Sequence, residues 1–219
     1  MVEILQDFEP FFGHSKTNIP ETGAFHYLRK LGVIDIGSNS VRMVIFDGAA
    51  RSPAYFFNEK ILCGLGSGLA HSGKLHAKGK LRAISAIERF VNLADAMEVP
   101  QLSLIATAAV RSASDGLLFC DEIKRKTGKE INIIDGTEEA RLSAQGVMLG
   151  WPGAYGLVCD LGGSSMELAE INQGSVGKCL TSELGPLILK ELKGGKKNRK
   201  QHIKAVSYTH LRAHETLDN

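Results

Sequence analysis

The chain has 219 residues, of which 43% are hydrophobic and 23% are charged, and its formal net charge is +2. This composition is typical of a soluble globular protein with one or two domains. The small charge excess does not support a nucleic-acid partner. Because no run of about 18 apolar residues is present, we predict no membrane partner or span.

The cysteines and the first residues indicate a compartment. Cys63, Cys120, Cys159 and Cys179 form no C-x-x-C pair, and three of them lie in apolar runs. We interpret all four as reduced core residues of a cytoplasmic protein. The first residues carry acids and no basic segment before an apolar stretch, so no secretory signal is predicted.

Three strands are predicted near the start of the chain. Residues 1–30 show little periodicity and are interpreted as an extension. Residues 31–37, 41–48 and 54–65 are rich in apolar and β-branched side chains and are joined by short polar turns. This pattern predicts an antiparallel meander. The glycine-rich residues 64–75 are interpreted as a loop.

Helices and strands then alternate. A helix is predicted from about Ala77 to Met97, with Leu81 and Ile84 on its apolar stripe. A strand follows at 102–108, then a helix at 114–128 with Ser114 as its N-cap, then a strand at 131–135. The order β-β-β-α-β-α-β is that of a ribonuclease-H-like α/β domain, which we assign to residues 31–135.

The pattern restarts after Asp135. Residues 136–150 predict a helix, and three more strands and the start of another helix follow. VIDIGSNSVRMVI also resembles VCDLGGSSMELAE, and this alignment places Asp35 opposite Asp160. We therefore predict a second ribonuclease-H-like copy, truncated, over residues 136–192.

The end of the chain fits no domain. Residues 193–205 are a basic segment that we interpret as a solvated tail rather than a substrate path. VSYTHLRAHET, which begins at Val206, can be translated from a DNA string that resembles the transposase adapter of short-read library preparation. We interpret residues 206–219 as an artefactual tail, and we expect the chain to be a fragment, inactive alone.

Small polar turns follow the first strand of each copy. Backbone N–H groups in such turns can point at phosphate oxygens, and Ser and Asn side chains add donors. Asp35 and Asp160, at the ends of these strands, are suited to Mg²⁺, which prefers oxygen ligands. The alternative is two ordinary hairpins, but the repetition favours a two-part phosphate clamp.

Two further charged groups stand near element ends. Glu138 and Glu139 lie in the first turn of a predicted helix, where acids are stabilised by the helix dipole. One acid suffices for that purpose, so the second could serve as a general base for water. Arg111 follows a buried strand, and its guanidinium can bind phosphate through two donors.

Five collinear motifs carry a family resemblance over about residues 31–192: DIGSNS, ATAAVR, GTEEAR, DLGGSSMEL and SELGPLIL. Together they resemble the exopolyphosphatase/guanosine pentaphosphate phosphohydrolase (Ppx/GppA) family of the actin-like ATPase superfamily. The family's glycine-rich motif ends G-G-G-S-T-E, so Ser164 stands in place of a glycine and Met166 in place of a threonine.

The resemblance implies roles for individual residues. Glu139 is implied as the catalytic base, and Asp35, Asp160 and Glu167 as the magnesium ligands. The implied phosphate-binding residues come from both turns and from the strand end before the second helix: Gly37, Ser38, Asn39, Ser40, Arg111, Gly162, Gly163, Ser164 and Ser165.

The resemblance implies hydrolysis of a phosphoanhydride. The expected reaction is release of terminal phosphate from inorganic polyphosphate or pppGpp by a Glu-activated water with Mg²⁺. A homodimer of the full-length protein is left open. The alternatives are another actin-like ATPase or sugar-kinase-type phosphotransferase, which GTEEAR argues against, and a non-catalytic nucleotide or phosphate sensor, which an intact Glu139 argues against.

Overall fold

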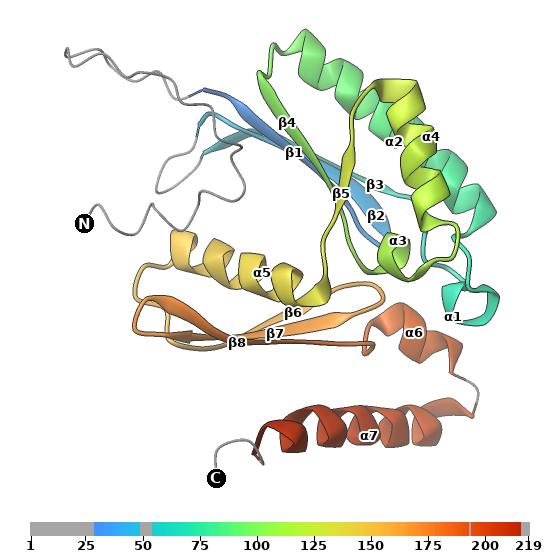
Figure 1. Ribbon diagram of the computed structural model, residues 1–219, viewed down its shortest axis with the longest axis vertical. Coiled ribbons are helices and arrows are strands. Elements are labelled where there is room, and N and C mark those ends of the chain that lie inside the picture. The colour runs from blue at the N-terminus through green and yellow to red at the C-terminus, as the bar shows by residue number, and fades with distance from the viewer. Residues whose placement is uncertain (1–28, 49–53, 193, 216–219) are drawn as a thin grey trace.

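The computed structural model describes residues 29–48, 54–192 and 194–215, with side chains as far as residue 207. Helix α5 lies between two sheets, and the long helix α7 lies beside the second sheet (Figure 1). The strands are β1 (Leu31–Ile36), β2 (Ser40–Phe46), β3 (Tyr55–Leu62), β4 (Gln101–Ala106), β5 (Ile131–Ile133), β6 (Gly156–Leu161), β7 (Met166–Asn172) and β8 (Ser175–Ser182). The helices are α1 (Leu69–Ser72), α2 (Ala77–Ala96), α3 (Ala108–Ser112), α4 (Gly116–Thr127), α5 (Gly136–Gly150), α6 (Pro186–Glu191) and α7 (Gly195–Glu215).

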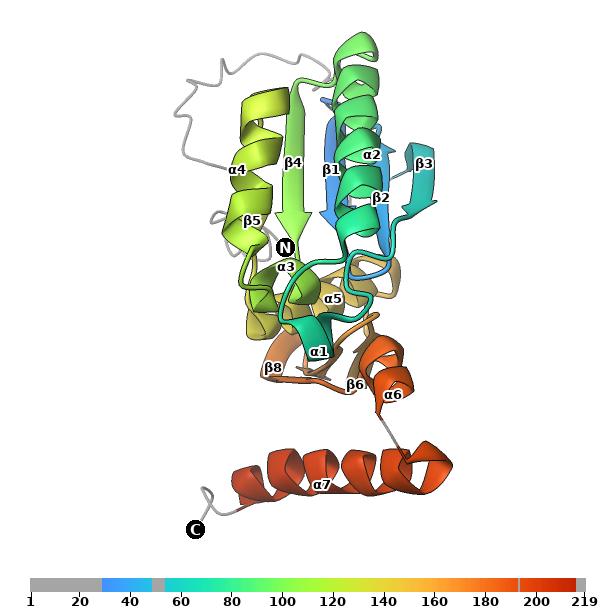
Figure 2. The ribbon, with the colours of Figure 1, turned by 90° about the vertical axis from the view of Figure 1, so that its right-hand side faces the viewer.

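The first sheet has the strand order β3-β2-β1-β4-β5. β1, β2 and β3 form an antiparallel meander, while β4 and β5 add to β1 in parallel. The predicted ribonuclease-H-like order of elements is therefore confirmed. Figure 2 shows α2 and α4 on the same face of this sheet. The opposite face is turned toward α5 (Figure 1).

The core of the first sheet follows from strand alternation. Ile34 and Ile36 on β1 and Met43 on β2 point toward α2 and are fully buried. Phe90 is fully buried on the apolar face of α2. Leu81 was wrongly predicted to share that face. It lies on the far side of the helix from the residues that α2 buries, and its side chain is exposed.

Two short helices were not predicted. α1 occupies part of the segment interpreted as a loop, and α3 begins directly after β4. Each has fewer than two turns, so neither leaves a helical period in the sequence.

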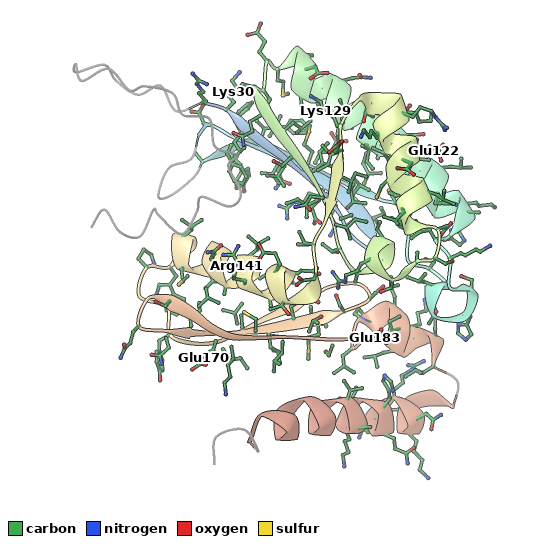
Figure 3. The ribbon with its side chains drawn as sticks, viewed as in Figure 1. Lys30, Glu122, Lys129, Arg141, Glu170 and Glu183 are labelled. Atoms are coloured by element: carbon green, nitrogen blue, oxygen red, sulfur yellow. The ribbon has the colours of Figure 1, made fainter. Side chains whose placement is uncertain are left out.

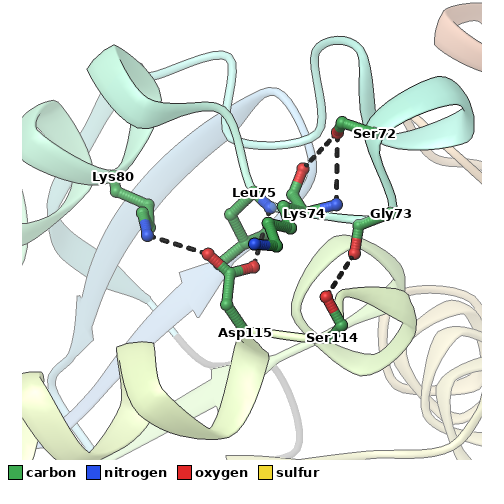
Figure 4. Close-up of polar contacts among 7 residues, drawn as sticks. All are labelled: Ser72, Gly73, Lys74, Leu75, Lys80, Ser114 and Asp115. Carbon is green, nitrogen blue, oxygen red and sulfur yellow. Dashed lines mark hydrogen bonds and ion pairs between the residues drawn. The ribbon is translucent and has the colours of Figure 1, made fainter.

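The start of α4 also differs from the prediction. Asp115, not Ser114, holds the N-cap position. The Ser114 hydroxyl instead donates to the Gly73 carbonyl oxygen at 2.9 Å. Asp115 accepts from the Leu75 amide at 2.9 Å and pairs with Lys80 Nζ at 2.8 Å (Figure 4). These contacts tie the start of α4 to the segment that leads into α2.

The second sheet repeats the first three strands. β6, β7 and β8 form another antiparallel meander, and α5 covers one face through a small core that includes Ala140, Ala144 and Ile171. Glu170 points away from α5, on the outer face (Figure 3). In the described part of the chain, no strand after β8 corresponds to β4 or β5, and the truncation of the second copy stays a prediction.

The outer face of the second sheet is apolar and partly open. Leu157 and Leu161 on β6 are 69% and 60% exposed. Near β8 the face carries a small apolar pocket of about 50 Å³, lined by Met166, Leu168 and Val206 among others. Within the described ranges, β6 pairs with β7 only, whereas its counterpart β1 pairs on both edges.

The cysteine prediction holds in part. All four cysteines are free thiols, as predicted. Cys63 is buried, but Cys159 is exposed on the outer face of β6, so its interpretation as a core residue was wrong. The error arises because an apolar run was interpreted as a strand that is buried on both faces. That interpretation holds only where other elements cover both faces of the sheet.

The end of the described chain is helical. α7 begins within the predicted basic segment and crosses the boundary proposed at Val206. The origin of residues 206–219 stays a prediction. Of the predicted extension, only Arg29 and Lys30 fall within the described residues. No described helix is long and apolar enough to cross a membrane.

Candidate active site

The first polar turn connects β1 to β2. The Gly37 amide donates to the Ser40 carbonyl oxygen at 3.0 Å, which closes the turn. The Gly66 amide donates to the Ser38 carbonyl at 2.7 Å, and the amides of Cys63 and Gly64 both donate to the Asn39 carbonyl at 2.9 Å. Backbone hydrogen bonds therefore hold the turn in place, while the Asn39 side chain stays exposed.

The second polar turn connects β6 to β7. Ser164 and Ser165 are buried in this turn. The Leu187 amide of α6 donates to the Gly163 carbonyl at 2.9 Å. Gly185 packs so closely on Ser164 and Gly163 that a Cβ at this position would collide with their backbone. The start of α6 therefore supports the second turn as residues 63–66 support the first.

The two turns are in contact. A Cβ placed on Gly163 would lie 3.0 Å from Ser38 Cβ and 3.5 Å from the Asn39 amide nitrogen. A Cβ on Gly66 would lie 3.1 Å from both Ser38 Cβ and Ser164 Oγ. The structure thus brings together the predicted phosphate-binding residues of both copies.

Glu139 and Arg111 meet beside these turns. Asp135 caps α5 by accepting from the Glu138 amide at 2.8 Å, which sets Glu139 in the first turn. Arg111, near the end of α3, donates through Nη1 to the Ile134 carbonyl at 2.7 Å and to Glu139 Oε2 at 3.2 Å. The guanidinium thereby links β5 to α5 and fixes the carboxylate.

The environment of Glu139 changes its proton affinity. The pKa of this carboxyl is raised to about 7, first by burial and then by the nearby carboxylate of Glu167. Arg111 and the Thr107 hydroxyl act in the opposite direction. A carboxylate with a pKa close to neutral is matched to general base catalysis.

Three acidic residues predicted to bind metal lie around the junction of the turns. Glu167 is fully buried, and its Oε1 accepts from the Thr181 hydroxyl at 2.9 Å. Burial raises its pKa, and so does the charge of Asp160. Partial desolvation raises the pKa of Asp35, and Asp160 adds to that effect, while Arg42 and Lys60 lower it. The charge of Asp160 therefore acts on the Asp35 carboxyl across the junction.

The donor set fits a magnesium ion that also binds substrate. Glu167 Oε2 is buried and has no hydrogen-bond partner in the described structure, which leaves it available to a cation or water. In the described residues, no three His, Cys, Asp or Glu side chains form a ready-made metal site. Mg²⁺ commonly takes one or two carboxylates and completes its shell with water and substrate phosphates. The magnesium prediction is thus compatible with the geometry, although it stays untested.

The family model for the Ppx/GppA phosphatase family matches residues 33–212. The chain belongs to the Ppx/GppA phosphatase family. The match contains both turns, Glu139 and Arg111, and it reaches into α7, where it overlaps the segment interpreted as an artefactual tail.

Curated relatives come from two branches of the Ppx/GppA family. The chain is 31% identical over 143 residues to exopolyphosphatase 1 of Mycobacterium tuberculosis, covering 64% of this chain and 42% of that protein. It is 32% identical over 151 residues to the guanosine-5'-triphosphate,3'-diphosphate pyrophosphatase of Aliivibrio fischeri, covering 68% of this chain and 30% of that protein. The chain spans less than half the length of these curated relatives.

Solved structures agree on the fold. An exopolyphosphatase from Cytophaga hutchinsonii is similar with a TM-score of 0.77 and 27% identity, over 86% of this chain and 64% of that chain. A Ppx/GppA family member from Aquifex aeolicus has a TM-score of 0.64 and 24% identity, over 80% of this chain and 58% of that chain. The second likeness concerns the fold alone.

The two departures from the Ppx/GppA motif have structural explanations. Ser164 does not have a positive φ, so its backbone accepts a Cβ without strain. Met166 lines the apolar pocket on the outer face of the second sheet, whereas Glu167, the next residue on β7, points toward α5. A hydroxyl at position 166 would therefore point away from the turns.

Sequence reasoning missed several supporting residues. Ser143 donates to Asp160 Oδ2 at 2.5 Å, and it lies four residues after Glu139 on the same helix face, so helical spacing could have found it. Thr107 lies within the recognised ATAAVR motif and bonds to Glu139. Thr181 faces Glu167 only through the pairing of β7 with β8, and Gly66 reaches the site from the loop after β3. Neither position carries a local signal.

Proposed function

We propose that this protein hydrolyses phosphoanhydrides, releasing the terminal phosphate of inorganic polyphosphate, of pppGpp, or of both. The proposal rests chiefly on Glu139, a carboxyl with a pKa of about 7 held by Arg111 beside two glycine- and serine-rich turns that touch. The names of relatives in both branches of the family support these two substrate classes.

Each group of residues in the candidate active site has a separate role in this proposal. The two turns, Gly37–Ser40 and Gly162–Ser165, bind the terminal phosphate through backbone amides and hydroxyls. Arg111 holds Glu139 Oε2 and contributes positive charge near the transferred phosphoryl group. Glu139, about half deprotonated near pH 7, accepts the proton of the attacking water.

Asp35 and Asp160 would hold Mg²⁺, and Glu167 Oε2 would face it directly or through water. When bound, the ion neutralises charge on the phosphate oxygens. We also propose a cytoplasmic location, because all four cysteines are free thiols.

The test measures phosphate release from long-chain polyphosphate and from pppGpp with Mg²⁺, in the unaltered protein and in Glu139→Gln. Because the chain spans only part of its relatives, the assay is run on the 219-residue chain and on the longest reading frame that contains residues 1–205. We expect turnover by the longer protein only, lowered about 10²- to 10⁴-fold by the substitution.

The matched control is Glu138→Gln, one residue away. Glu138 pairs with Arg141 at 2.7 Å, so turnover should hardly change. Equal losses in both variants would contradict the role of Glu139. Binding of either substrate by the longer protein without any release would instead favour a sensor.

A further inference from the structure

Two acidic side chains stand opposite each other in the second sheet, next to the second polar turn. Asp160 on β6 is directly opposite Glu167 on β7. Residues opposite each other in antiparallel strands point to the same face, with Cβ atoms about 5 Å apart. Val158, two residues before Asp160, packs in the core under α5, so both carboxylates lie on the face that α5 covers (Figure 1). Two carboxylates in this arrangement match the one or two that Mg²⁺ commonly takes.

Each of these carboxylates is held by a hydroxyl through one of its two oxygens. The Ser143 hydroxyl of α5 donates to Asp160 Oδ2 at 2.5 Å. The Thr181 hydroxyl of β8 donates to Glu167 Oε1 at 2.9 Å, and Glu167 Oε2 has no hydrogen-bond partner in the described residues. These bonds leave the other oxygen of each carboxylate, Oδ1 of Asp160 and Oε2 of Glu167, for a further ligand.

The bond from Ser143 matters most for Asp160 because packing does not restrain that side chain. Glu167 is fully buried, whereas Asp160 is exposed. Without Ser143, the Asp160 side chain would have to give up rotamer freedom when it binds a cation. Ser143 lies four residues after Glu139, on the same face of α5. One helix face therefore places both the candidate base and the donor that orients Asp160.

The first copy of the fold has no equivalent of this contact among the described residues. The internal repeat aligns Asp35 with Asp160, but within the described ranges no side-chain hydroxyl donates to the Asp35 carboxylate. Burial and neighbouring charges set the environment of Asp35 instead. Of the two aspartates that the repeat aligns, Asp160 is thus the one whose orientation a hydroxyl fixes.

We propose that Ser143 is a positioning residue for a divalent cation, because its hydroxyl holds the Asp160 carboxylate and leaves Oδ1 for the ion. The inference rests on the proposed function for the identity of the ion, but it does not require turnover. Mg²⁺ demands near-ideal octahedral geometry, so a ligand that is already oriented costs less to order. The competing explanation is that the bond only fastens α5 to β6. Its loss would then lower stability and leave the metal affinity unchanged.

Metal binding without substrate separates these explanations. Mn²⁺ suits the same carboxylate and water ligands as Mg²⁺, and its electron paramagnetic resonance signal reports the free ion during titration into the 219-residue chain. We expect Ser143→Ala to weaken Mn²⁺ binding about tenfold, as is usual when a group that orients a metal ligand is removed. Ser143→Thr keeps the hydroxyl and should restore most of the affinity. Ser85→Ala, which removes an exposed hydroxyl from α2, is the matched control and should leave the affinity unchanged.

Three results would overturn the role of Ser143. They are unchanged Mn²⁺ affinity in Ser143→Ala, no recovery in Ser143→Thr, and an equal loss in Ser85→Ala. Absence of Mn²⁺ binding by the unaltered chain would overturn it as well. Thermal unfolding of each variant without metal is measured in parallel, because a loss of binding that only follows a loss of folded protein would favour the structural explanation. The expected pattern of affinities in a protein that never releases phosphate would keep the role of Ser143 and refute the enzyme.

Discussion

Replacing Glu139 by Gln should make the protein more stable at alkaline pH. A rise of the pKa from 4.5 to about 7 means that the folded state disfavours the ionised carboxyl by roughly 3 kcal/mol. Glutamine has the same shape, and its amide oxygen can still accept from Arg111 Nη1. The substitution therefore removes the cost of the charge without opening a cavity.

The sign of the pH effect follows from proton binding. Between about pH 4.5 and 7, the folded protein binds more protons at Glu139 than the unfolded chain does. The contribution of this group to the free energy of unfolding therefore falls as the pH rises through that range. We expect the variant to exceed the unaltered protein by about 1–3 kcal/mol at pH 8, and by less than about 0.5 kcal/mol at pH 4.5.

Denaturant titration at both pH values measures this difference. Glu138→Gln serves as the matched control, because its partner Arg141 lies at 2.7 Å and its carboxylate is a third exposed. That variant should show no gain at pH 8. An equal change at both pH values in Glu139→Gln, or a loss of stability at pH 8, would refute the reasoning. A gain in stability together with a loss of turnover would show that the protein keeps Glu139 for activity at a cost in stability.

Three further outcomes follow from the site. Phosphate release should rise with pH and level off above about 7, since Glu139 must be deprotonated to accept a proton; a flat pH–rate profile would argue against it. Gly66→Ala should insert a methyl group between the two turns and destabilise the protein by about 1–3 kcal/mol, while Gly146→Ala, in open space on α5, should not; thermal unfolding compares them. Glu191→Ala should cost about 1 kcal/mol, because Glu191 Oε1 accepts from the Gly68 amide at 2.7 Å, and unchanged unfolding would contradict a link between α6 and α1.

The sequence predicted those elements whose pattern is local. Alternation in β1 and β2 gave the meander, and the helix predicted over residues 136–150 has the bounds of α5. The repeat of a strand-terminal aspartate and a polar turn located both halves of the candidate site. Each of these signals lies within about fifteen consecutive residues.

The features that the sequence did not predict depend on contacts between residues that are far apart in the sequence. Glu167 is buried beside Thr181 because of the register between β7 and β8, and Gly66 reaches both turns from the loop after β3. Leu81 was assigned to the wrong face because it lies three residues before Ile84, a spacing that fits an apolar helical stripe. The direction of its side chain nevertheless lies far from the centre of the face that α2 buries. The pKa of Glu139 required knowledge of burial, which no spacing supplies.

The open edge of β6 bears on how any rate is measured. Among the described residues β6 pairs with β7 only, and a strand with such an edge and with exposed Leu157 and Leu161 is a template on which a strand from another chain can add. Association through this edge would depend on protein concentration and would lower the number of independent molecules in solution. Rates per chain should therefore be compared across a dilution series, and a charged substitution such as Leu157→Lys offers a way to keep the chains apart.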